Sequence, residues 1–551
     1  MTGRPGEPPR AVGRRARTTH LWAIALALLA AAVYANSLAN GFAWDDVLIV
    51  QDNEAIRNLA GVPDLFTRPY WPSGDPARGL YRPVTLTSFA IDWALGGGRP
   101  LAFHVLNVLL HAGVTVLVLL LLRRVGAPLP AASAGAAVFA VHPVHTEAVA
   151  NVVGRGELLV ALFTLLGALA YLRYAWGPLR RTALVACVYA LALGAKENAL
   201  VFPALLFLLE LLRPNREAPL GVRLRREWPV YAALGLVAAL YLAVRYAVLG
   251  VLTSRDVAAY LVGLPASTRV ATALRIVPEY VRLLVFPRDL VADYGPAVIM
   301  AVSPADVRVW FGLALMAGAL ALAWAWRRER PLVTLAVLWL AIAIFPVSNL
   351  LVPVGVWLAE RALYLPSIGV ALLVAAIADA AARSRTGVWL GAAALLVALA
   401  AGTWRTWVRN PVWRSSDAGL DTLIEEHPES YRSQWALGVR LASRGALEPA
   451  LRSLEHAIGL VPNETFVRLD QAEVLLAAGR AGEAEAALRP LVGIVSRRKY
   501  VLLGHALARQ GRPAEAAAAV EEGLRHYPDD GALRRLRERL APVEPRHGVV
   551  P

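Results

Sequence analysis

Residues 101–122 read LAFHVLNVLLHAGVTVLVLLLL, an apolar run without a charged residue that ends at Arg123 and Arg124. A helix needs about 20 such residues to cross the hydrocarbon core of a membrane, so the run predicts a membrane span. The rest of the chain agrees, because 57% of the 551 residues are hydrophobic and the mean hydropathy is +0.50. This composition predicts a polytopic membrane protein and excludes an ordinary soluble one.

Apolar stretches on both sides of this run bring the prediction to about eleven spans in an all-α membrane domain of residues 20–410. Two of the stretches are short. We interpret them as two tilted helices that meet at Lys196 and Glu197 rather than as one broken helix. The predicted spans are 20–38, 101–122, 129–149, 157–175, 182–195, 198–212, 229–250, 307–326, 332–351, 362–382 and 387–405.

The net charge of +15 comes mostly from arginines, which cluster in alternate connections between the spans. Short positive connections face the cytoplasm, so the charge records topology and argues against a nucleic-acid partner. We expect a cytoplasmic tail at 1–19, an uncleaved first span, and an extracytoplasmic chain after Trp404, in the inner (plasma) membrane of a cell. The arginine clusters are Arg14, Arg15 and Arg17; Arg123 and Arg124; Arg180 and Arg181; Arg223, Arg225 and Arg226; Arg327, Arg328 and Arg330; and Arg383 and Arg385.

Two further features concern the origin of the chain and its long connections. Abundant alanine and arginine indicate a bacterial protein, and the single Cys187 excludes a disulfide within the chain. The connections 39–100 and 251–306 are both predicted to be exterior loops. Stretches from Val84 to Trp93 and from Val270 to Phe286 predict one helix at the membrane interface in each loop.

Residues 417–541 are alanine-rich, charged and repetitive. Small residues recur in phase where paired helices would approach closely, and glycines recur where the chain would turn. The pattern resembles three tetratricopeptide repeats near 431–464, 465–496 and 497–530, with a capping helix from Gly531 to Leu540 and a tail at 542–551. An α-solenoid is therefore predicted after the membrane domain. The residues in phase are Gly438, Ala472 and Gly504; Gly445, Gly479 and Gly511; and Ala450, Ala484 and Ala516.

Ionisable residues gather at the exterior ends of the predicted spans. Charged groups in membrane segments are costly and mark function, whereas the cytoplasmic ends carry little besides arginines that we expect to be solvated. The arrangement predicts a polar, water-accessible cavity that opens outward. The residues are Asp45, Asp46, Arg82, His142, His145, Glu147, Arg155, Glu157, Lys196, Glu197, Glu360 and Arg361.

Asp45 and Asp46 follow the first span directly. A carboxylate at a membrane cavity can take a proton from a hydroxyl group, and a close like charge raises the pKa of one acid and makes it a stronger base. An interfacial helix cap or a solvated turn is the alternative interpretation of the pair. We predict that one of the two is catalytic and favour Asp45, although either can be the base.

The segment from His142 to Glu147 has two histidines three residues apart and a nearby acid. This is a weak pattern for a metal site, because Pro143 interrupts the helix that would align the ligands. A divalent metal is therefore not favoured, and no cofactor is assigned. We expect hydrogen bonds to a sugar or an acceptor instead, from His142, His145 and Glu147 and from Glu157 and Glu197.

Arginine and lysine side chains offer sites for a phosphate. Arg155 lies between two glycines that admit a close approach, and its planar guanidinium suits a phosphate. Alternatively, Arg155 only neutralises Glu157 or Glu147. Arg82 and Lys196 are the other predicted phosphate ligands.

A different interpretation applies to Glu360 and Arg361. These neighbours in the sequence are interpreted as a local ion pair that orients the last helices.

Several of these residues lie in motifs that follow one another along nearly the whole chain. The motifs are Tyr34-Ala-Asn36 through Trp44-Asp45-Asp46, Tyr81-Arg-Pro-Val-Thr85, Phe103-His-Val-Leu-Asn-Val-Leu-Leu-His111, Phe139-Ala-Val-His-Pro-Val-His-Thr-Glu-Ala148, Val153-Gly-Arg-Gly-Glu-Leu-Leu159, Lys196-Glu197 and Ala359-Glu-Arg-Ala-Leu-Tyr-Leu-Pro-Ser-Ile-Gly369. With the repeats, this set resembles the transmembrane and tetratricopeptide-repeat protein O-mannosyltransferases.

The resemblance implies a glycosyltransferase of the GT-C fold that takes its sugar from a polyprenyl phosphate, which is dolichyl phosphate mannose in eukaryotic members. It implies a serine or threonine hydroxyl of an exported protein as acceptor. It also implies that the acid of the first exterior loop, at Asp45 or Asp46, is the base. No nucleotide is needed for such a reaction.

The resulting hypothesis is an inverting membrane glycosyltransferase whose repeats bind the acceptor polypeptide. One alternative has the same fold but transfers the sugar to a glycan, a lipid or a cell-wall polymer. Another is a non-enzymatic membrane scaffold whose repeats bind secreted proteins. A transporter is not favoured, because the charges avoid the middle of the membrane.

Overall fold

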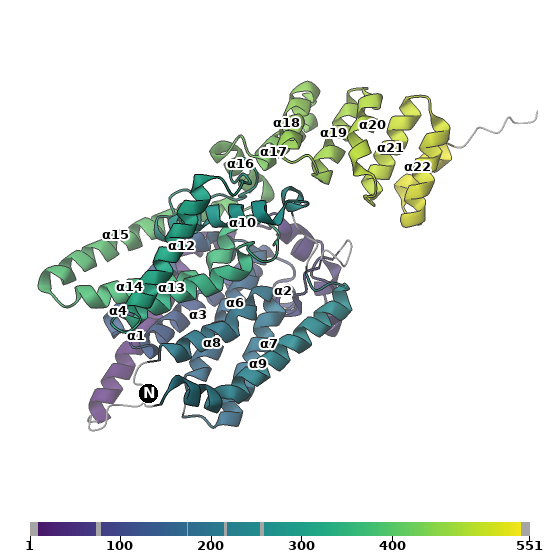
Figure 1. Cartoon of the computed structure of the whole chain (residues 1–551). Helices are drawn as coiled ribbons and strands as arrows, with labels where there is room; N and C mark the ends of the chain where they lie inside the picture. The colour runs from purple at the N-terminus through teal and green to yellow at the C-terminus, as the bar shows by residue number, and fades with distance from the viewer. Residues whose placement is uncertain (1–8, 73–78, 174, 214–217, 254–257, 541–551) are drawn as a thin grey trace, which may run out of the picture. The chain divides into compact units, whose positions relative to one another are not determined.

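A computed structural model describes residues 9–72, 79–173, 175–213, 218–253 and 258–540. Every regular element in these ranges is helical, which confirms the predicted all-α class (Figure 1). The tail predicted at 542–551 and the first part of the N-terminal tail lie outside the described residues.

The α-helices up to the repeats fall into two groups, those before the second long loop and those that lie in it or follow it. The first group is α1 Pro9–Val33, α2 Pro83–Gly96, α3 Pro100–Arg124, α4 Leu129–Val141, α5 Thr146–Val149, α6 Arg155–Tyr171, α7 Pro178–Ala195, α8 Phe202–Leu211 and α9 Leu220–Leu249. The second is α10 Ala266–Arg275, α11 Val277–Val285, α12 Val307–Trp326, α13 Pro331–Ile344, α14 Ser367–Ala381, α15 Arg385–Arg409 and α16 Ser416–Glu426.

Six helical segments in the described ranges are long and apolar enough to cross a membrane. They indicate a multi-pass membrane protein, although the predicted set of about eleven spans is not established by length and composition alone. The six are Pro100–Arg124, Val152–Tyr171, Pro178–Ala195, Leu220–Leu249, Val307–Trp326 and Arg385–Trp413. Shorter apolar helices are Arg17–Val33, Leu129–Val141, Pro331–Val347 and Ser367–Ala381.

Exposed tryptophans mark both ends of α12 and α15. Trp310 lies near the start of α12 and Trp404 near the end of α15, whereas Trp324 and Trp389 lie at the opposite ends of the same helices. Tryptophan is enriched where a membrane meets water, so these side chains fit two membrane surfaces. The largest hydrophobic core is built around α3, which packs against α1, α4 and α6.

The two short apolar stretches are confirmed as separate helices. α7 ends at Ala195, Lys196 is extended with φ −162° and ψ 142°, and a short 3-10 turn, η8 at Glu197–Val201, leads into α8. This break is what brings Lys196 and Glu197 to the end of α7.

The two predicted loop helices have different outcomes. The first is present as α2, which extends the predicted Val84 to Trp93 and ends at Gly97 with φ +59°. The second prediction is wrong as a single helix. It is two helices, α10 and α11, that meet at Ile276, because Pro278 has no N–H group to continue the first helix.

Two of the arginines that we expected to be solvated are buried. Arg181 forms an ion pair with Glu227, and Arg223 forms one with Glu210 at 2.6 Å. The prediction was wrong for these two because it ignored acids from neighbouring helices, which neutralise the charges inside the helix bundle.

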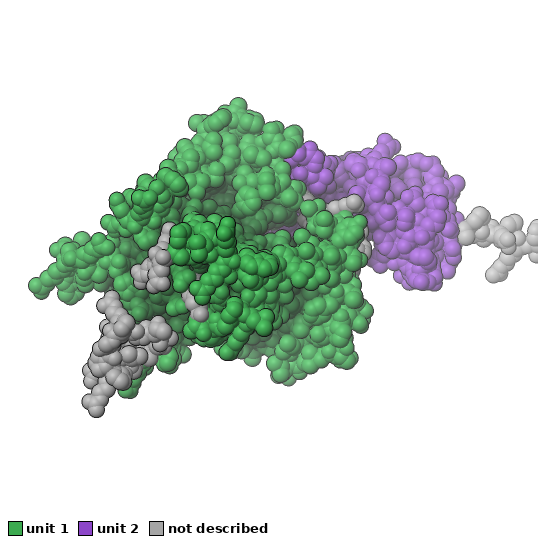
Figure 2. Space-filling view, turned by 60° about the horizontal axis from the view of Figure 1, so that its bottom comes forward, with its two compact units in different colours: residues 1–257, 265–294, 301–422 green, residues 258–264, 295–300, 423–551 purple. Residues whose placement is uncertain are grey.

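The chain divides into two compact units, coloured separately in Figure 2. The first contains residues 1–257, 265–294 and 301–422, and the second contains 258–264, 295–300 and 423–551. The second long loop thus contributes two segments to the repeat unit, where the Tyr431 N–H donates to the Pro296 carbonyl at 3.3 Å. Three helix pairs and a last helix follow in this unit: α17 Tyr431–Ser443 with α18 Leu447–Leu460, α19 Thr465–Ala477 with α20 Ala481–Leu488, α21 Arg497–Arg509 with α22 Pro513–His526, and α23 Gly531–Leu540.

The small residues in phase act as the repeat pattern requires. A Cβ on Gly438 would lie 2.7 Å from Cγ of Leu454, so only glycine lets α17 and α18 pack this closely. Gly445, which turns the chain between them, has φ +77°. The helix pairs therefore have the packing of tetratricopeptide repeats.

Candidate active site

The acid pair follows a strained turn. Trp44 has φ +54°, a left-handed conformation that is unfavourable for a bulky residue. Its N–H donates to Oγ of Ser416 at 2.8 Å, and its indole packs so closely on Gly419 that a Cβ there would lie 2.4 Å from Nε1. A π-helical turn at Val47–Gln51 comes directly after the acids. Both features are concentrated at functional sites in proteins.

Asp46 is fully buried and accepts three main-chain hydrogen bonds. Its Oδ1 accepts from the N–H of Val153 at 2.8 Å, and its Oδ2 accepts from those of Ala43 and Val152 at 3.1 and 3.3 Å. Burial raises the pKa of Asp46 to about 7, although these hydrogen bonds oppose the shift. Asp46 therefore ties the turn to the start of the α6 segment.

Asp45 has the opposite surroundings. Its carboxylate is half-buried and makes no hydrogen bond or ion pair with any residue that the structure describes. Both of its oxygens are therefore open to a proton donor. Its neighbours in the sequence limit its movement, because the backbone of Trp44 is strained and the carboxylate of Asp46 is fixed by hydrogen bonds.

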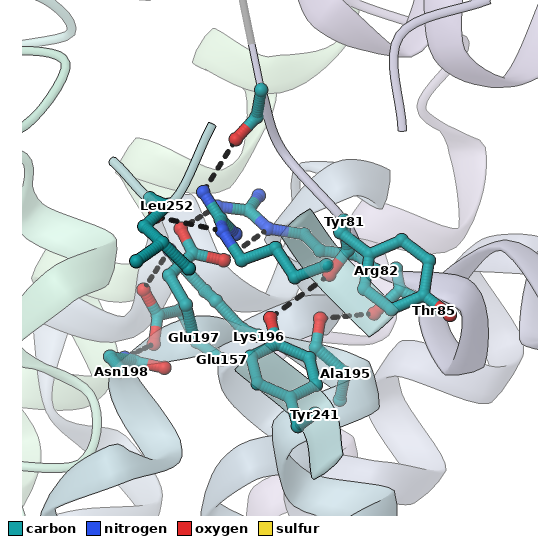
Figure 3. A network of polar contacts seen from close by, with 12 residues as sticks. Tyr81, Arg82, Thr85, Glu157, Ala195, Lys196, Glu197, Asn198, Tyr241 and Leu252 are labelled. Carbon is teal, nitrogen blue, oxygen red and sulfur yellow. Dashed lines mark hydrogen bonds and ion pairs between the residues drawn. The ribbon is translucent and has the colours of Figure 1, made fainter. Parts of the chain in front are cut away.

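Arg82 and Glu197 form a two-point ion pair, shown in Figure 3. Nε of Arg82 donates to Oε2 of Glu197 at 3.0 Å, and Nη2 donates to Oε1 at 2.6 Å. This pairing lowers the pKa of Glu197 to about 2, although burial opposes the shift. The Arg82 segment is fixed on α7 because Oγ1 of Thr85 donates to the Ala195 carbonyl at 2.8 Å. The guanidinium also lies 5.0 Å from the ring centre of Tyr70.

Lys196 pairs with Glu157 from the first turn of α6. Nζ of Lys196 lies 2.5 Å from Oε1 of Glu157, and Nδ2 of Asn198 donates to Oε2 at 2.8 Å (Figure 3). Glu157 is 1% exposed and Lys196 is 14% exposed, so the cation is the accessible member of the pair.

Arg361 pairs with Glu147 and not with its neighbour. Its guanidinium forms an ion pair with Oε1 of Glu147, and its N–H donates to Oε2 at 2.8 Å. Oε1 of Glu360 instead accepts from the Val291 N–H at 2.6 Å and from the hydroxyl of Tyr294 at 2.9 Å. The predicted local ion pair is therefore wrong, because consecutive residues of the 3-10 turn Glu360–Leu363, η11, point to different elements.

Arg82 and Arg361 both act on Lys196, and Asp45 acts on Arg361. Burial lowers the pKa of Lys196, and the positive charges of Arg82 and Arg361 lower it further. Glu147 raises the pKa of Arg361 most, and the negative charge of Asp45 raises it too. Such effects fall off steeply with distance, so these groups form one cluster. In this cluster each cation forms an ion pair with a glutamate, whereas Asp45 forms no ion pair with a described residue.

Arg155 does not join this cluster. The side chain is completely buried, and it forms an ion pair with Asp92 at 2.5 Å and donates to Oδ1 of Asn107 at 2.7 Å and to the Phe103 carbonyl at 2.8 Å. This placement contradicts the predicted phosphate contact, because the guanidinium has no exposed surface and its donors are used. It also contradicts the alternative partners Glu147 and Glu157. The glycine before it is required for packing, since a Cβ on Gly154 would lie 2.5 Å from the Glu147 carbonyl.

The histidine segment is buried beside the cluster. Nε2 of His142 lies 3.0 Å from the Leu284 carbonyl, and Nε2 of His145 lies 2.7 Å from Oγ of Ser367. Among the described residues, no three His, Cys, Asp or Glu side chains are placed to hold a metal ion. Both histidines therefore use Nε2 to join segments of the protein. Neither Nε2 is free to bind a sugar in this geometry.

Known proteins match this chain over most of its length. A mouse protein named protein O-mannosyl-transferase TMTC3 is 28% identical over 496 residues, which are 83% of this chain and 53% of the mouse protein. Human protein O-mannosyl-transferase TMTC4 is 29% identical and covers 78% of this chain and 65% of its own length. The chain is a distant homologue of the TMTC protein O-mannosyl-transferases. It spans about half the length of the mouse relative.

Three further comparisons gave a short match, no match and a weak structural match. Drosophila protein O-mannosyl-transferase Tmtc2 is 38% identical, but over only 152 residues, 26% of this chain and 16% of its own. No protein-family model matches the chain. A chain in the crystal structure of the APC/C hetero-tetramer Cut9-Hcn1 is 14% identical and covers 90% of this chain and 95% of its own, but its TM-score of 0.25 does not establish a shared fold. The relatives named here are animal proteins, so the bacterial origin of this TMTC homologue stays a prediction.

Two residues of this TMTC homologue were not given their partners from the sequence. Arg361 was assigned to a local pair with Glu360, and Asp92, which neutralises Arg155 outside the cluster, was not singled out. The position of Asp92 inside a charge-poor helix was the one available signal, because an acid on an apolar helix predicts a buried cation. Nothing local marks the partner of Arg361, since Glu147 comes from a remote segment.

Proposed function

We propose that this protein is a membrane glycosyltransferase that moves a sugar, mannose by analogy with its relatives, from a polyprenyl phosphate to a hydroxyl group. The main observation behind the proposal is the environment of Asp45. This residue has a half-buried carboxylate that makes no hydrogen bond to a described residue, and its charge acts on Arg361 of the cation cluster. The printed names of the homologues support the same reaction class.

The proposed chemistry uses Asp45 as the base. Its carboxylate takes the proton of the acceptor hydroxyl, and the hydroxyl oxygen attacks C1 of the sugar. The bond from C1 to the phosphate oxygen breaks, and the lipid phosphate leaves with the electron pair. Attack from the face opposite the phosphate inverts the configuration at C1. A positioned base of this kind contributes about 10² to 10⁴ in rate.

Arg82, Lys196 and Arg361 are the proposed phosphate ligands. Arg361 is the most exposed, at 31%, followed by Lys196 at 14% and Arg82 at 12%. Positive groups near the departing oxygen stabilise the charge that grows on it in the transition state. Arg361 replaces Arg155 in this role. Glu147, Glu157 and Glu197 keep the cations in place before the donor binds.

The acceptor is proposed to be a serine or threonine of an exported protein, bound by the repeat unit on the extracytoplasmic side of the membrane. Paired repeat helices form extended surfaces that suit polypeptide ligands. The orientation follows the positive-inside rule, which puts the arginine-rich helix ends in the cytoplasm.

The test uses the full chain in membranes with a radiolabelled polyprenyl-phosphate mannose and an extract of exported proteins. Label in a protein band that β-elimination releases supports the proposal. Full transfer by both Asp45→Asn and Asp46→Asn would contradict the assignment of the base. Label in a glycan, lipid or cell-wall fraction would replace the proposed acceptor, and absence of any sugar transfer would favour a scaffold.

A further inference from the structure

A second group of cations lies at the other end of α6 and α7. The active-site residues Glu157 and Lys196 stand at the start of α6 and the end of α7, whereas residues 172–177 connect the two helices at their far ends. α6 has 17 residues, so its ends lie about 25 Å apart, close to the thickness of a membrane core. The connection is therefore at the opposite membrane surface.

Two arginines in this connection stack on one tryptophan. Cζ of Arg173 lies 5.0 Å from the ring centre of Trp176, and Cζ of Arg180 lies 4.8 Å from it. Trp176 is half-buried and packs against the main hydrophobic core, so it is a fixed support. The indole attracts each guanidinium, and since both Cζ atoms lie within 5.0 Å of one ring centre, they are less than about 10 Å apart.

The two guanidinium groups lack a counter-charge among the described residues. Both side chains are exposed, and neither forms an ion pair with a carboxylate in the part of the chain that the structure describes. Arg181, the next residue, is different, because it is buried in its ion pair with Glu227. Each exposed guanidinium therefore keeps planar donors that suit a phosphate oxygen.

The surroundings favour a lipid over a free ion. Leu179 lies between the stacked arginines in sequence and is 83% exposed, at the end of two apolar helices. An exposed leucine beside exposed arginines is expected where side chains meet the boundary between acyl chains and headgroups. A net negative headgroup fits better than a zwitterionic one, whose own ammonium would be repelled.

We propose that Arg173 and Arg180, held by Trp176, bind the phosphate of an anionic phospholipid at the membrane surface opposite the active site. Leu179 contacts the acyl chains below the headgroup. The site is independent of the sugar donor, because it needs neither Asp45 nor the cation cluster. Basic pockets at the cytoplasmic ends of membrane helices bind anionic headgroups in the same way.

The test is native mass spectrometry of the full chain in a neutral detergent, with dioleoyl-phosphatidylglycerol and dioleoyl-phosphatidylcholine as probes. Wild-type protein is expected to retain phosphatidylglycerol in preference. The Arg173→Ala, Arg180→Ala variant should lose roughly tenfold in affinity for it. The matched control is Arg225→Ala, Arg226→Ala, which removes the same charge from exposed arginines at the start of α9 that stack on no described ring.

Four outcomes would overturn the proposal or a part of it. Equal loss in the control would reduce the effect to general positive charge, and unchanged retention in the Arg173→Ala, Arg180→Ala variant would exclude the site. Inorganic phosphate that raises the melting temperature as much as phosphatidylglycerol would indicate a free-anion site. If the alanine variant melts at a lower temperature in detergent alone, the Arg173→Lys, Arg180→Lys variant replaces it in the test. Lysine keeps the charge but lacks the planar guanidinium donors, so this variant should retain less phosphatidylglycerol than the wild type. Full retention of phosphatidylglycerol would overturn the role of the guanidinium donors.

Discussion

The Arg155–Asp92 pair and the Arg361–Glu147 pair join the same kinds of side chain, but their exposure differs. Arg155 is 0% exposed and its acid 4%, whereas Arg361 is 31% exposed and its acid 4%. Arg155 also donates to Asn107 and to the carbonyl of Phe103, and its guanidinium lies 4.8 Å from the ring centre of Phe89. Arg361 has a solvent-facing side from which a ligand can approach.

The comparison separates charges that join helices from charges that can act on a substrate. A sealed pair cannot exchange its partner for a phosphate without leaving a carboxylate buried and unpaired, which is costly. A pair with an exposed cation can make that exchange. Exposure of the cation is therefore the property to test.

The largest effect is expected from Arg155→Ala. The change leaves Asp92 buried without its cation and should cost about 3 to 5 kcal/mol, enough to prevent accumulation of folded protein. The measurement is the yield and melting temperature of the purified chain. Arg155→Met with Asp92→Leu removes both charges and should recover folded protein. Normal folding of Arg155→Ala alone would break the comparison.

The next largest effect is on catalysis. Asp45→Asn should lower sugar transfer by about 10² to 10⁴ while the melting temperature stays near that of the wild type, because Asp45 makes no hydrogen bond to the described residues. The measurement pairs initial rates with thermal unfolding.

Asp46→Asn is the matched control. The new amide nitrogen faces main-chain N–H donors, so the variant should lose about 1 to 3 kcal/mol of stability. Equal stability of the two variants would contradict the different roles assigned to the neighbouring acids.

Arg361→Ala tests the exposed pair directly. It should lower transfer by about 10², because one positive group near the leaving phosphate is lost. Stability should change less than in Arg155→Ala, since Glu147 keeps the hydrogen bond from the main-chain N–H of residue 361. A fall in melting temperature as large as that of Arg155→Ala, with transfer per folded molecule unchanged, would make both pairs structural.

The smallest effect concerns pH. Burial raises the pKa of Asp46 to about 7, so between pH 4 and 7 the folded chain keeps a proton that the unfolded chain has lost. The free energy of unfolding should therefore fall as pH rises through this range. We expect the melting temperature to decline by a few degrees towards pH 8, and Asp46→Asn to flatten the profile. The Arg82–Glu197 pair acts in the opposite direction, because the pKa of Glu197 is lowered from 4.5 to about 2, and its contribution to the slope ends above about pH 5.5, where Glu197 is ionised in both states.

Helix positions were the most predictable part of the fold. The break at Lys196 and the helix pairs of the repeats follow from apolar length, glycines and prolines, which act on the chain within a few residues. The single helix expected from Val270 to Phe286 failed for a local reason too, because the effect of Pro278 was overlooked.

The candidate site was predictable in part of its membership but not in its pairing. Arg82, Lys196 and Asp45 gather as polar residues at one end of the spans should, because charge avoids the membrane core. The exclusion of Arg155 and the inclusion of Arg361 required coordinates. Which acid neutralises which arginine depends on helices that meet in space, and Arg361 and Glu147 are 214 positions apart in the chain.

The amino-acid sequence by itself determined that this is an all-α, multi-pass membrane protein with repeats, because apolar length and small-residue phase are local properties of the chain. It also placed an acid pair beside a span. Only the tertiary structure separated the two acids, since Asp46 is used by main-chain N–H groups from residues 152 and 153 and Asp45 is left open. Burial and partner choice are decided by what packs against a side chain, and no stretch of sequence contains that information.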